Sequence, residues 1–295
     1  MIQSESHFIK QKDFSLHFKR FFTDDKAPSV MLVHGSIEDG RIFYSKSGKG
    51  LAPFLAENGY DVFVPDMRGK GKSTPAIDKN ASFGQYEGIT EDMSLFLEAV
   101  EKIKGKKPEY LMAHSWGGVI SLSYLARNEY ESLKGLVFFG SKRDVRVQNF
   151  NRWLNIDLLW NTLGNILVKR YGYFPAKKFK AGSADESKNF FLQVNNWVYA
   201  KNWIDEIDGF NYAEKLKEKK LPPILSITGA KDTHAGHPKD VKRLLAEIGN
   251  QANHEFKVIG KRQGYAHDYD HINLLTHPEA KKDHFKEVLE WLRRH

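Results

Sequence analysis

Residues 109–118, Glu109-Tyr110-Leu111-Met112-Ala113-His114-Ser115-Trp116-Gly117-Gly118, place a serine between a short apolar run and two glycines. The run before the serine is typical of a buried strand, and the residues after it, up to about 127, have the apolar spacing of a helix. A serine on so sharp a turn holds its hydroxyl clear of the backbone, within reach of a base and a substrate. The turn also needs small residues two positions before and after, where Ala113 and Gly117 stand. We predict that Ser115 is a nucleophile; the alternative is a buried serine in an ordinary packing turn.

The same alternation of apolar runs and amphipathic stretches extends on both sides of this turn. Strand, helix, strand and helix in this order favour right-handed crossovers and a mainly parallel sheet. Residues 13–22 alternate apolar and polar side chains and predict an earlier, half-exposed strand, and Thr90 is the expected cap of one helix. The expected buried strands are residues 29–33, 60–65, 109–113, 133–139, 223–229 and 254–259, and the expected helices are residues 50–58, 89–104, 117–127, 238–248 and 278–293.

This alternation stops between residues 142 and 216. The apolar residues of this segment follow helical rather than strand spacing, and aromatic residues are dense in it. We predict that residues 142–216 form a helical cap inserted into an α/β core made of residues 1–141 and 217–295. Four of the six tryptophans of the chain lie in this segment, namely Trp153, Trp160, Trp197 and Trp203.

A serine nucleophile needs two partners. Its hydroxyl is a poor nucleophile at neutral pH until a base activates it, and the base needs a carboxylate that orients it. Asp232 follows the strand expected at residues 223–229, at the edge of the sheet where ligand chemistry gathers in open α/β folds. We predict that Asp232 is this carboxylate. Asp144, which follows the preceding strand, is the competing acid, and a turn aspartate that bonds only its own backbone is the structural alternative.

Two histidines follow the last expected strand and compete for the role of the base. His271 begins the apolar stretch Ile272-Asn273-Leu274-Leu275, which anchors its backbone while its ring points into the site. His267 lies in a more polar and looser segment. We predict that His271 is the base and keep His267 as the alternative.

A tetrahedral intermediate carries a negative oxygen, which two backbone N–H groups can stabilise. Loss of one such donor costs roughly 3 kcal/mol of barrier. One expected donor is the N–H of Trp116, the residue after the nucleophile. The other is the N–H of Ser36, because Gly35 in the loop after residues 29–33 lets the backbone turn inward. The alternative is that this loop is merely a turn.

Together these stretches resemble the α/β-hydrolase superfamily, and within it the branch of monoacylglycerol lipases, lysophospholipases and serine-aminopeptidase-like enzymes. The resemblance covers about residues 30–140 and returns at 223–295. It implies a mainly parallel eight-stranded sheet flanked by helices, and a triad in the chain order serine, acid, histidine, at Ser115, Asp232 and His271. The motifs that carry it are Leu32-Val33-His34-Gly35, Leu51-Ala52-Pro53-Phe54-Leu55-Ala56, Gly59-Tyr60-Asp61-Val62, Asp66-Met67-Arg68-Gly69-Lys70-Gly71-Lys72-Ser73, the stretch around Ser115, and Asp268-Tyr269-Asp270-His271, which also looks like the histidine loop of acid lipases.

Composition narrows the class of protein further. The chain has 295 residues, 41% of them hydrophobic and 28% charged, which is enough for one large α/β domain. It contains no cysteine, so thiol nucleophiles, thiolate metal sites and disulfides are excluded. The net charge of +8 comes from lysines scattered among acidic residues, so a nucleic-acid partner is not expected, although acidic substrates or anionic lipid would be attracted. No stretch approaches the ~18 apolar residues of a membrane span, and we expect a cytoplasmic protein.

The expected function is hydrolysis of a small-molecule carboxylic ester with an apolar acyl chain, because an aromatic cap would line the pocket and exclude water. Hydrolysis of an amide, a thioester or a carbon–carbon bond on the same triad is one alternative. A ligand-binding protein on a hydrolase scaffold is the other. The cap matches no subfamily, so the substrate itself is not implied. Neither a cofactor nor a metal is expected, since His234 and His237 lack a supporting cluster and Asp66 stands where a phosphate-binding loop needs a glycine.

Overall fold

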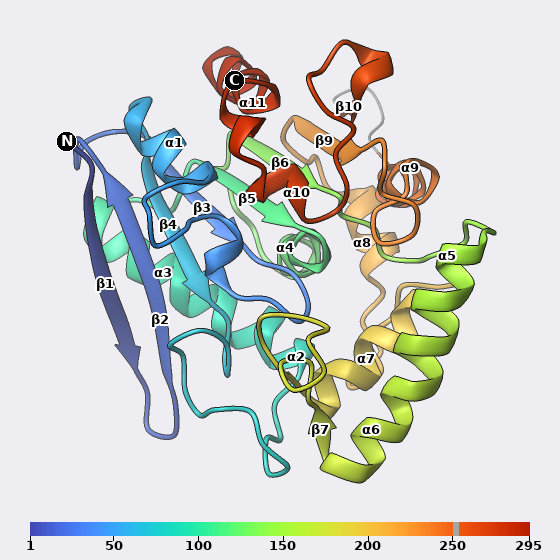
Figure 1. Cartoon of the computed structure of the whole chain (residues 1–295). Helices are drawn as coiled ribbons and strands as arrows, with labels where there is room; N and C mark the ends of the chain where they lie inside the picture. Colours follow the sequence, from blue (N-terminus) through green and yellow to red (C-terminus); the bar gives the residue numbers. More distant parts are fainter. Residues whose placement is uncertain (250–253) are drawn as a thin grey trace.

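A computed structural model describes residues 1–249 and 254–295 of the chain. Eight strands of the described residues form one sheet, in the order β1-β2-β4-β3-β5-β6-β9-β10 (Figure 1). The pairs β1–β2 and β2–β4 are antiparallel, and the pairs from β4 to β10 are parallel, which confirms the mainly parallel sheet. The strands are β1 (Gln3–Lys10), β2 (Ser15–Phe22), β3 (Ser29–Val33), β4 (Asp61–Asp66), β5 (Tyr110–His114), β6 (Gly135–Phe139), β9 (Ile224–Gly229) and β10 (His254–Ile259).

Helices cover both faces of the sheet, so the central strands are buried on both sides. Side chains alternate along each strand, and neighbouring residues therefore enter different cores. One core joins the strands to α3 (Met93–Lys104), α4 (Trp116–Arg127) and α9 (Pro238–Glu247), and the other joins them to α1 (Leu51–Glu57) and α11 (His284–Arg294). The first core takes Met31, Val33, Leu111, Ala113, Leu136 and Phe138 from the strands, and the second takes Val30, Leu32, Met112, Val137, Phe139 and Ile227.

Three details differ from the sequence-based expectations. Strand β1 was not expected, because its residues are mostly exposed and carry no core pattern. Thr90 is wrong as a helix cap: the helical run already begins at α2 (Gln85–Glu87), and the Thr90 hydroxyl donates to the Tyr86 carbonyl inside it, at 2.8 Å. The last helix is interrupted, with a 3-10 turn η6 (Pro278–Lys281) before α11.

The chain leaves the sheet after β6 and returns to it at β9, the neighbouring strand. Mainly helical elements fill the interval, as its apolar spacing predicts, and in Figure 1 they stand beside the sheet as the green and yellow segment. We call residues 142–216 the insertion. Its elements are α5 (Phe150–Arg152), η3 (Trp153–Leu163), α6 (Gly164–Tyr171), β7 (Tyr173–Phe174), β8 (Glu186–Ser187), α7 (Lys188–Tyr199) and α8 (Tyr212–Glu218).

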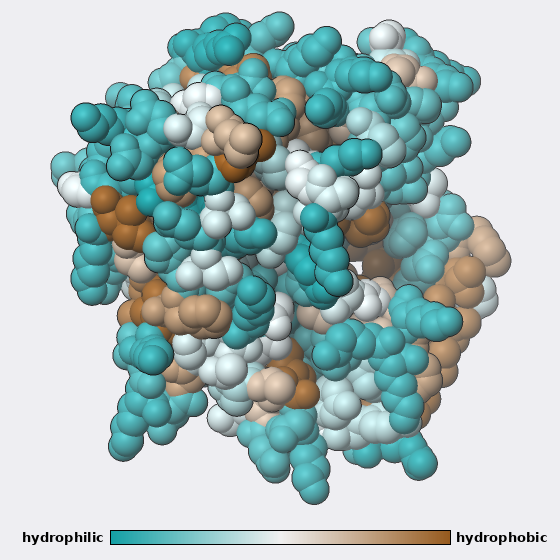
Figure 2. All heavy atoms as spheres, turned by 60° about the vertical axis from the view of Figure 1, so that its left-hand side comes forward, coloured by the Kyte–Doolittle hydropathy of each residue, from teal (hydrophilic) through white to brown (hydrophobic). Residues whose placement is uncertain are grey.

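The outer side of the insertion is apolar along one helical run. Large hydrophobic side chains of α5, η3 and α6 are exposed to solvent, and Figure 2 shows apolar side chains gathered along this edge of the molecule. Among the described residues, no helix has both the length and the apolar character that crossing a membrane requires. The exposed side chains are Phe150, Trp153, Leu159, Leu163 and Ile166.

The turn between β5 and α4 has the strained backbone expected of a serine held clear of the chain. Ser115 has φ 50° and ψ −122°, a conformation that non-glycine residues rarely adopt. Its amide N–H donates to the Phe139 carbonyl of β6 at 2.8 Å, which fixes the turn against the neighbouring strand. At Gly117 a side chain would meet main chain, since a Cβ there would lie 2.3 Å from the Val33 oxygen. Helix α4 therefore starts in contact with the end of β3.

Gly117→Ala should destabilise the protein by roughly 2 kcal/mol. Overpacking against backbone that cannot move aside costs about 3 kcal/mol at the upper end of the usual range, and the better helix propensity of alanine offsets about 1 kcal/mol of this cost. Urea unfolding measures the difference.

The matched control is Ser123→Ala in the same helix, where the buried hydroxyl has no hydrogen-bond partner among the described residues. Removing that hydroxyl should be neutral or slightly stabilising. Equal effects of the two alanine substitutions would contradict the close approach of α4 to β3.

Candidate active site

The loops after β9 and β10 bring Asp232 and His271 into contact. His271 Nδ1 donates to Asp232 Oδ2 at 2.6 Å, and the Gly236 N–H donates to Asp232 Oδ1 at 2.8 Å. Burial alone would raise the pKa of Asp232, but His271 and the Gly236 N–H lower it to about 2. Asp232 is therefore a buried, ionised acceptor that holds the imidazole by one nitrogen and leaves Nε2 for another partner.

His271 lies at the same edge of the sheet as Ser115. Its imidazole is packed against the loop after β6, where a side chain at Gly140 would come within 2.9 Å of the ring. The ring centroids of His271 and His114 are 4.7 Å apart, and His114 directly precedes the serine. No hydrogen bond joins the Ser115 hydroxyl to His271 within residues 1–249 and 254–295, so their contact remains a prediction. Such bonds are often long or poorly aligned without substrate.

The loop after β3 also reaches the serine. A Cβ at Gly35 would lie 2.9 Å from the Ser115 Cβ, so the main chain passes directly beside this side chain. In the described part of the chain, the backbone N–H groups of Ser36 and Trp116 have no hydrogen-bond acceptor. Both N–H groups predicted as oxyanion donors are thus uncommitted and lie next to Ser115 in space or in sequence.

A buried ion pair ties these loops together. His114 Nδ1 donates to Glu38 Oε1 at 2.7 Å, and His114 Nε2 donates to the backbone oxygen of His271 at 3.0 Å. The same Glu38 oxygen accepts the Gly35 N–H. Burial lowers the pKa of His114, but Glu38 outweighs this effect and leaves the pKa raised. Burial likewise raises the pKa of Glu38, which His114 turns into a net lowering. Both nitrogens of His114 are occupied, so it cannot serve as a base.

The insertion reaches this site through a second buried ion pair. Glu186 Oε1 accepts from the Lys70 ammonium at 2.6 Å, from the Ile37 N–H at 2.5 Å and from the Ser36 hydroxyl at 3.3 Å. The Ala184 N–H donates to the Ile37 oxygen at 3.0 Å. Ile37 has φ 53°, which is unusual for a β-branched residue and is supported by these contacts on both sides. The insertion therefore holds the backbone next to the predicted donor Ser36.

Asp144 and His267, the alternative acid and base, contact other residues. Asp144 accepts from Arg146 at 2.6 Å and from Arg243 at 3.3 Å, not from a histidine. The ring of His267 lies 4.2 Å from that of His277, between centroids. Neither residue touches the Asp232–His271 pair in the described structure, so the preferred acid and base are the ones brought together.

The sequence analysis assigns no role to four residues of this site, namely Glu38, Lys70, His114 and Glu186. Lys70 and His114 lie in motifs that carry the family resemblance, but their partners, Glu186 and Glu38, are far along the chain. A charged residue in a glycine-rich loop is the one local signal, and such residues are usually exposed.

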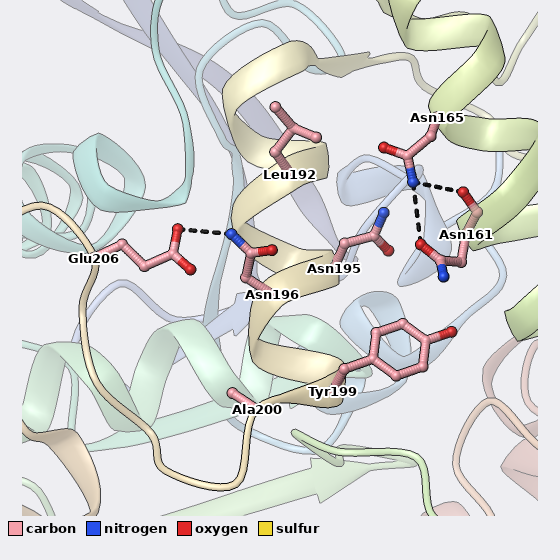
Figure 3. A pocket seen from close by; sticks show the side chains of 8 residues that line it. All are labelled: Asn161, Asn165, Leu192, Asn195, Asn196, Tyr199, Ala200 and Glu206. Atoms are coloured by element: carbon pink, nitrogen blue, oxygen red, sulfur yellow. Dashed lines mark hydrogen bonds between the residues drawn. The ribbon is translucent and has the colours of Figure 1, made fainter.

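A separate hollow of about 430 Å³ lies within the insertion, between η3 and α7 (Figure 3). Its walls are rich in amides, and Asn165 donates to Asn161 while Asn196 donates to Glu206. Neither Ser115 nor its predicted partners line this hollow. The lining residues are Asn161, Asn165, Leu192, Asn195, Asn196, Tyr199, Ala200 and Glu206.

The sheet order and the serine turn between β5 and α4 define the class of α/β hydrolases. A sequence profile described as "alpha/beta hydrolase fold" matches residues 28–270, and the chain belongs to this family. "Probable lysophospholipase L2" from Haemophilus influenzae is 24% identical over 214 residues, 70% of this chain and 62% of that protein. The monoglyceride lipase of Saccharomyces cerevisiae is 30% identical over 112 residues, 37% of this chain and 34% of that protein.

The chain thus spans between 34% and 62% of the length of these two curated relatives. A solved structure of a soluble variant of the yeast monoglyceride lipase, in complex with a substrate analog, aligns with a TM-score of 0.66 and 19% identity. The alignment covers 99% of this chain and 95% of that chain, which shows the shared fold. The family resemblance and the eight-stranded α/β-hydrolase fold expected from the sequence are confirmed.

Glu38→Gln should change how stability depends on pH, because it removes the charge opposite His114 and keeps an acceptor for the Gly35 N–H. The raised pKa of His114 means that the pair is fully stabilising below pH about 6.5, the ordinary histidine value, and loses this effect as pH rises through the raised value. The difference in unfolding free energy between wild type and Glu38→Gln should be largest from about pH 5 to 6.5 and shrink above that range. Urea titrations at several pH values measure it.

Glu57→Gln is the control, because Glu57 is exposed at the end of α1 and has no side-chain partner among the described residues. Its effect on unfolding free energy should not vary with pH over this range. A difference for Glu38→Gln that is also independent of pH would show that Glu38 and His114 are not a charged pair.

Proposed function

We propose that the protein is a serine hydrolase that cleaves a carboxylic ester with an apolar acyl chain. Ser115 is the nucleophile, His271 the general base and Asp232 the carboxylate that orients it. Nε2 of His271 removes the proton of the Ser115 hydroxyl as the oxygen attacks the ester carbonyl. The imidazolium then protonates the leaving alcohol, and water activated by the same base frees the acyl group from the enzyme.

The contact between Asp232 and His271 beside the strained Ser115 turn is the observation that supports this proposal most strongly. An ionised, buried carboxylate fixes the Nδ1–H tautomer, which is the tautomer whose Nε2 can accept a proton. It also stabilises the imidazolium that forms during the reaction. Residues 39 apart in sequence have little reason to make this contact for packing alone.

The uncommitted N–H groups of Ser36 and Trp116 support the same chemistry. They lie beside the serine on two loops whose positions are fixed by the close approach of Gly35 and by the start of α4. Donors held in place before the reaction stabilise a developing oxyanion without reorganisation. We therefore assign the oxyanion site to these two backbone groups.

We further propose that the insertion acts as a cap that selects the substrate. The indole of Trp116 packs against Trp197 of α7, with 6.3 Å between ring centroids, and Trp197 packs against Trp203. Buried aromatic side chains of the insertion thus extend the apolar core up to the residue after the nucleophile. The names of the two curated relatives, a lysophospholipase and a monoglyceride lipase, agree with an ester of an apolar acyl chain. The cytoplasmic location stays a prediction.

Ser115→Ala should abolish ester turnover and labelling by a fluorophosphonate probe, read as intact-protein mass. Asp232→Asn should lower kcat by roughly 10⁴, because the imidazole then takes the wrong tautomer. The matched control is Asp144→Asn, which changes an aspartate bound by arginines instead of His271 and should keep kcat/KM within about threefold. Full turnover by Ser115→Ala, or equal losses in the two aspartate variants, would exclude the proposed triad.

Turnover of 4-nitrophenyl esters should rise from the acetyl to the octanoyl ester. Each buried CH₂ group adds about 0.8 kcal/mol of favourable transfer, part of which the enzyme can use in the transition state. Values of kcat/KM across the series, taken below micelle formation, measure the trend. A flat or falling series would contradict an apolar acyl pocket while leaving the triad in place.

A further inference from the structure

Lys142 is a buried cation beside the candidate triad. It follows β6 by three residues and is only 8% exposed. Two residues earlier, Gly140 lies against the imidazole of His271. The Lys142 ammonium stands 5.8 Å from the ring centroid of Trp116, the residue after the nucleophile. The position of Lys142 thus places a positive charge at the edge of the sheet where the reaction is proposed to occur.

No acceptor is within bonding distance of this ammonium in residues 1–249 and 254–295. Its charge acts on three carboxylates, those of Asp232, Asp240 and Glu38, but it forms an ion pair with none of them. Each of the three is already engaged. Asp232 and Glu38 each bind a histidine and a backbone N–H, as described above, and Asp240 binds Arg243 at 2.5 Å and the Arg146 N–H at 3.1 Å.

Most of the Lys142 side chain is buried, but its ammonium nitrogen is not among the fully buried unpartnered atoms, so the ammonium faces solvent at this end of the sheet. Desolvation disfavours the charged form and lowers the pKa of Lys142, against the opposing effect of the three carboxylates. The ring of Trp116 offers a weak cation–π contact, which does not replace a hydrogen-bonded anion. The ammonium of Lys142 is thus held beside Trp116 by a buried side chain, has no acceptor among the described residues, and is open to a ligand that enters from solvent.

We propose that Lys142 binds an anionic group, a phosphate or a carboxylate, carried by the ester substrate. This inference rests on the proposed function, since it assigns the anion to the molecule whose ester bond Ser115 attacks. A bound anion would supply the missing acceptor and favour the charged form of the ammonium. Substrates with an anionic group would then be preferred over neutral esters of the same length. The site would bind such a substrate through the charge of Lys142 and through the apolar acyl chain of the substrate.

The competing explanation is that Lys142 only tunes the triad, because its charge also favours the ionised form of Asp232. The two roles differ in what they affect. A tuning residue changes the turnover of every ester alike, whereas a binding residue changes only the turnover of anionic esters. A substitution that removes the charge therefore separates them.

The experiment compares Lys142→Met with wild type on two matched pairs of esters, all below micelle formation. The first pair is 1-octanoyl-glycerol 3-phosphate and 1-octanoyl-glycerol, which tests a phosphate on the alcohol side. The second is the 4-nitrophenyl half-ester of suberic acid and 4-nitrophenyl octanoate, which tests a carboxylate on the acyl side. In at least one pair, wild type should prefer the anionic ester by roughly tenfold or more in kcat/KM, the size of a charge-assisted hydrogen bond.

Lys142→Met should lower kcat/KM for the anionic ester roughly tenfold more than for the neutral ester, so that the preference is lost. Lys142→Arg, which keeps the charge, should retain part of the preference. Lys201→Met is the matched control, because Lys201 is exposed in the insertion and has no partner among the described residues, and it should change neither ester. Equal losses on both esters of each pair, or no preference in wild type, would overturn the proposal. Thermal unfolding checks that each variant is folded.

A binding measurement keeps this inference separate from the proposed hydrolysis. Calorimetric titration of Ser115→Ala with hexyl phosphate and with hexanol requires no turnover. Tighter binding of hexyl phosphate, lost in the double variant Ser115→Ala/Lys142→Met, would support an anion site even if no ester were cleaved. The proposed function would stand and the anion site would be rejected if Ser115→Ala abolished ester turnover, hexyl phosphate and hexanol bound equally, and wild type showed no preference for the anionic ester in either pair.

Discussion

The main chain of α4 meets the end of β3 so closely at Gly117 that no side chain fits between them. In the turn that leads from β5 into this contact, Ser115 has a positive φ. Because β3, β5 and β6 are parallel neighbours, the loops that follow them meet at one edge of the sheet. The strand order of the sheet therefore brings together the Gly35 loop, the serine turn and the Gly140 loop, independently of their side-chain contacts.

Features that depend on local pattern could be predicted from the sequence. The bounds of the buried strands agree with the expected ones within a residue or two. Short apolar runs bounded by turn residues are typical of strands that are buried on both faces. Asp232 and His271 follow two such strands, and parallel strands end at the same edge, so their proximity follows from topology. Strand β1 carries no comparable pattern, since it lies exposed at the edge of the sheet.

Features that depend on long-range pairing could not be predicted. Glu38 and His114 are 76 residues apart, and no pattern around either residue distinguishes a buried ion pair from two solvated charges. Glu186 lies in a two-residue strand of the insertion, a type of element with no reliable sequence signature. Thr90 shows the opposite error, because a residue suited to capping lies inside a helical run that starts earlier, at Gln85. Tertiary packing decides these cases, and local propensity does not.

The buried cations around the site differ in how many partners they have, and this difference separates their roles. His114 and Lys70 bind groups on other loops, so their charges hold the loops around Ser115 and Ser36 in place. Buried pairs of this kind add little net stability, but removing one partner is costly, which makes them suited to fixing position. Lys142 is less deeply buried and has no hydrogen-bond or ion-pair partner in the described chain, so its charge holds no loop in place. The charge of Lys142 is therefore available to bind an anionic group of the substrate.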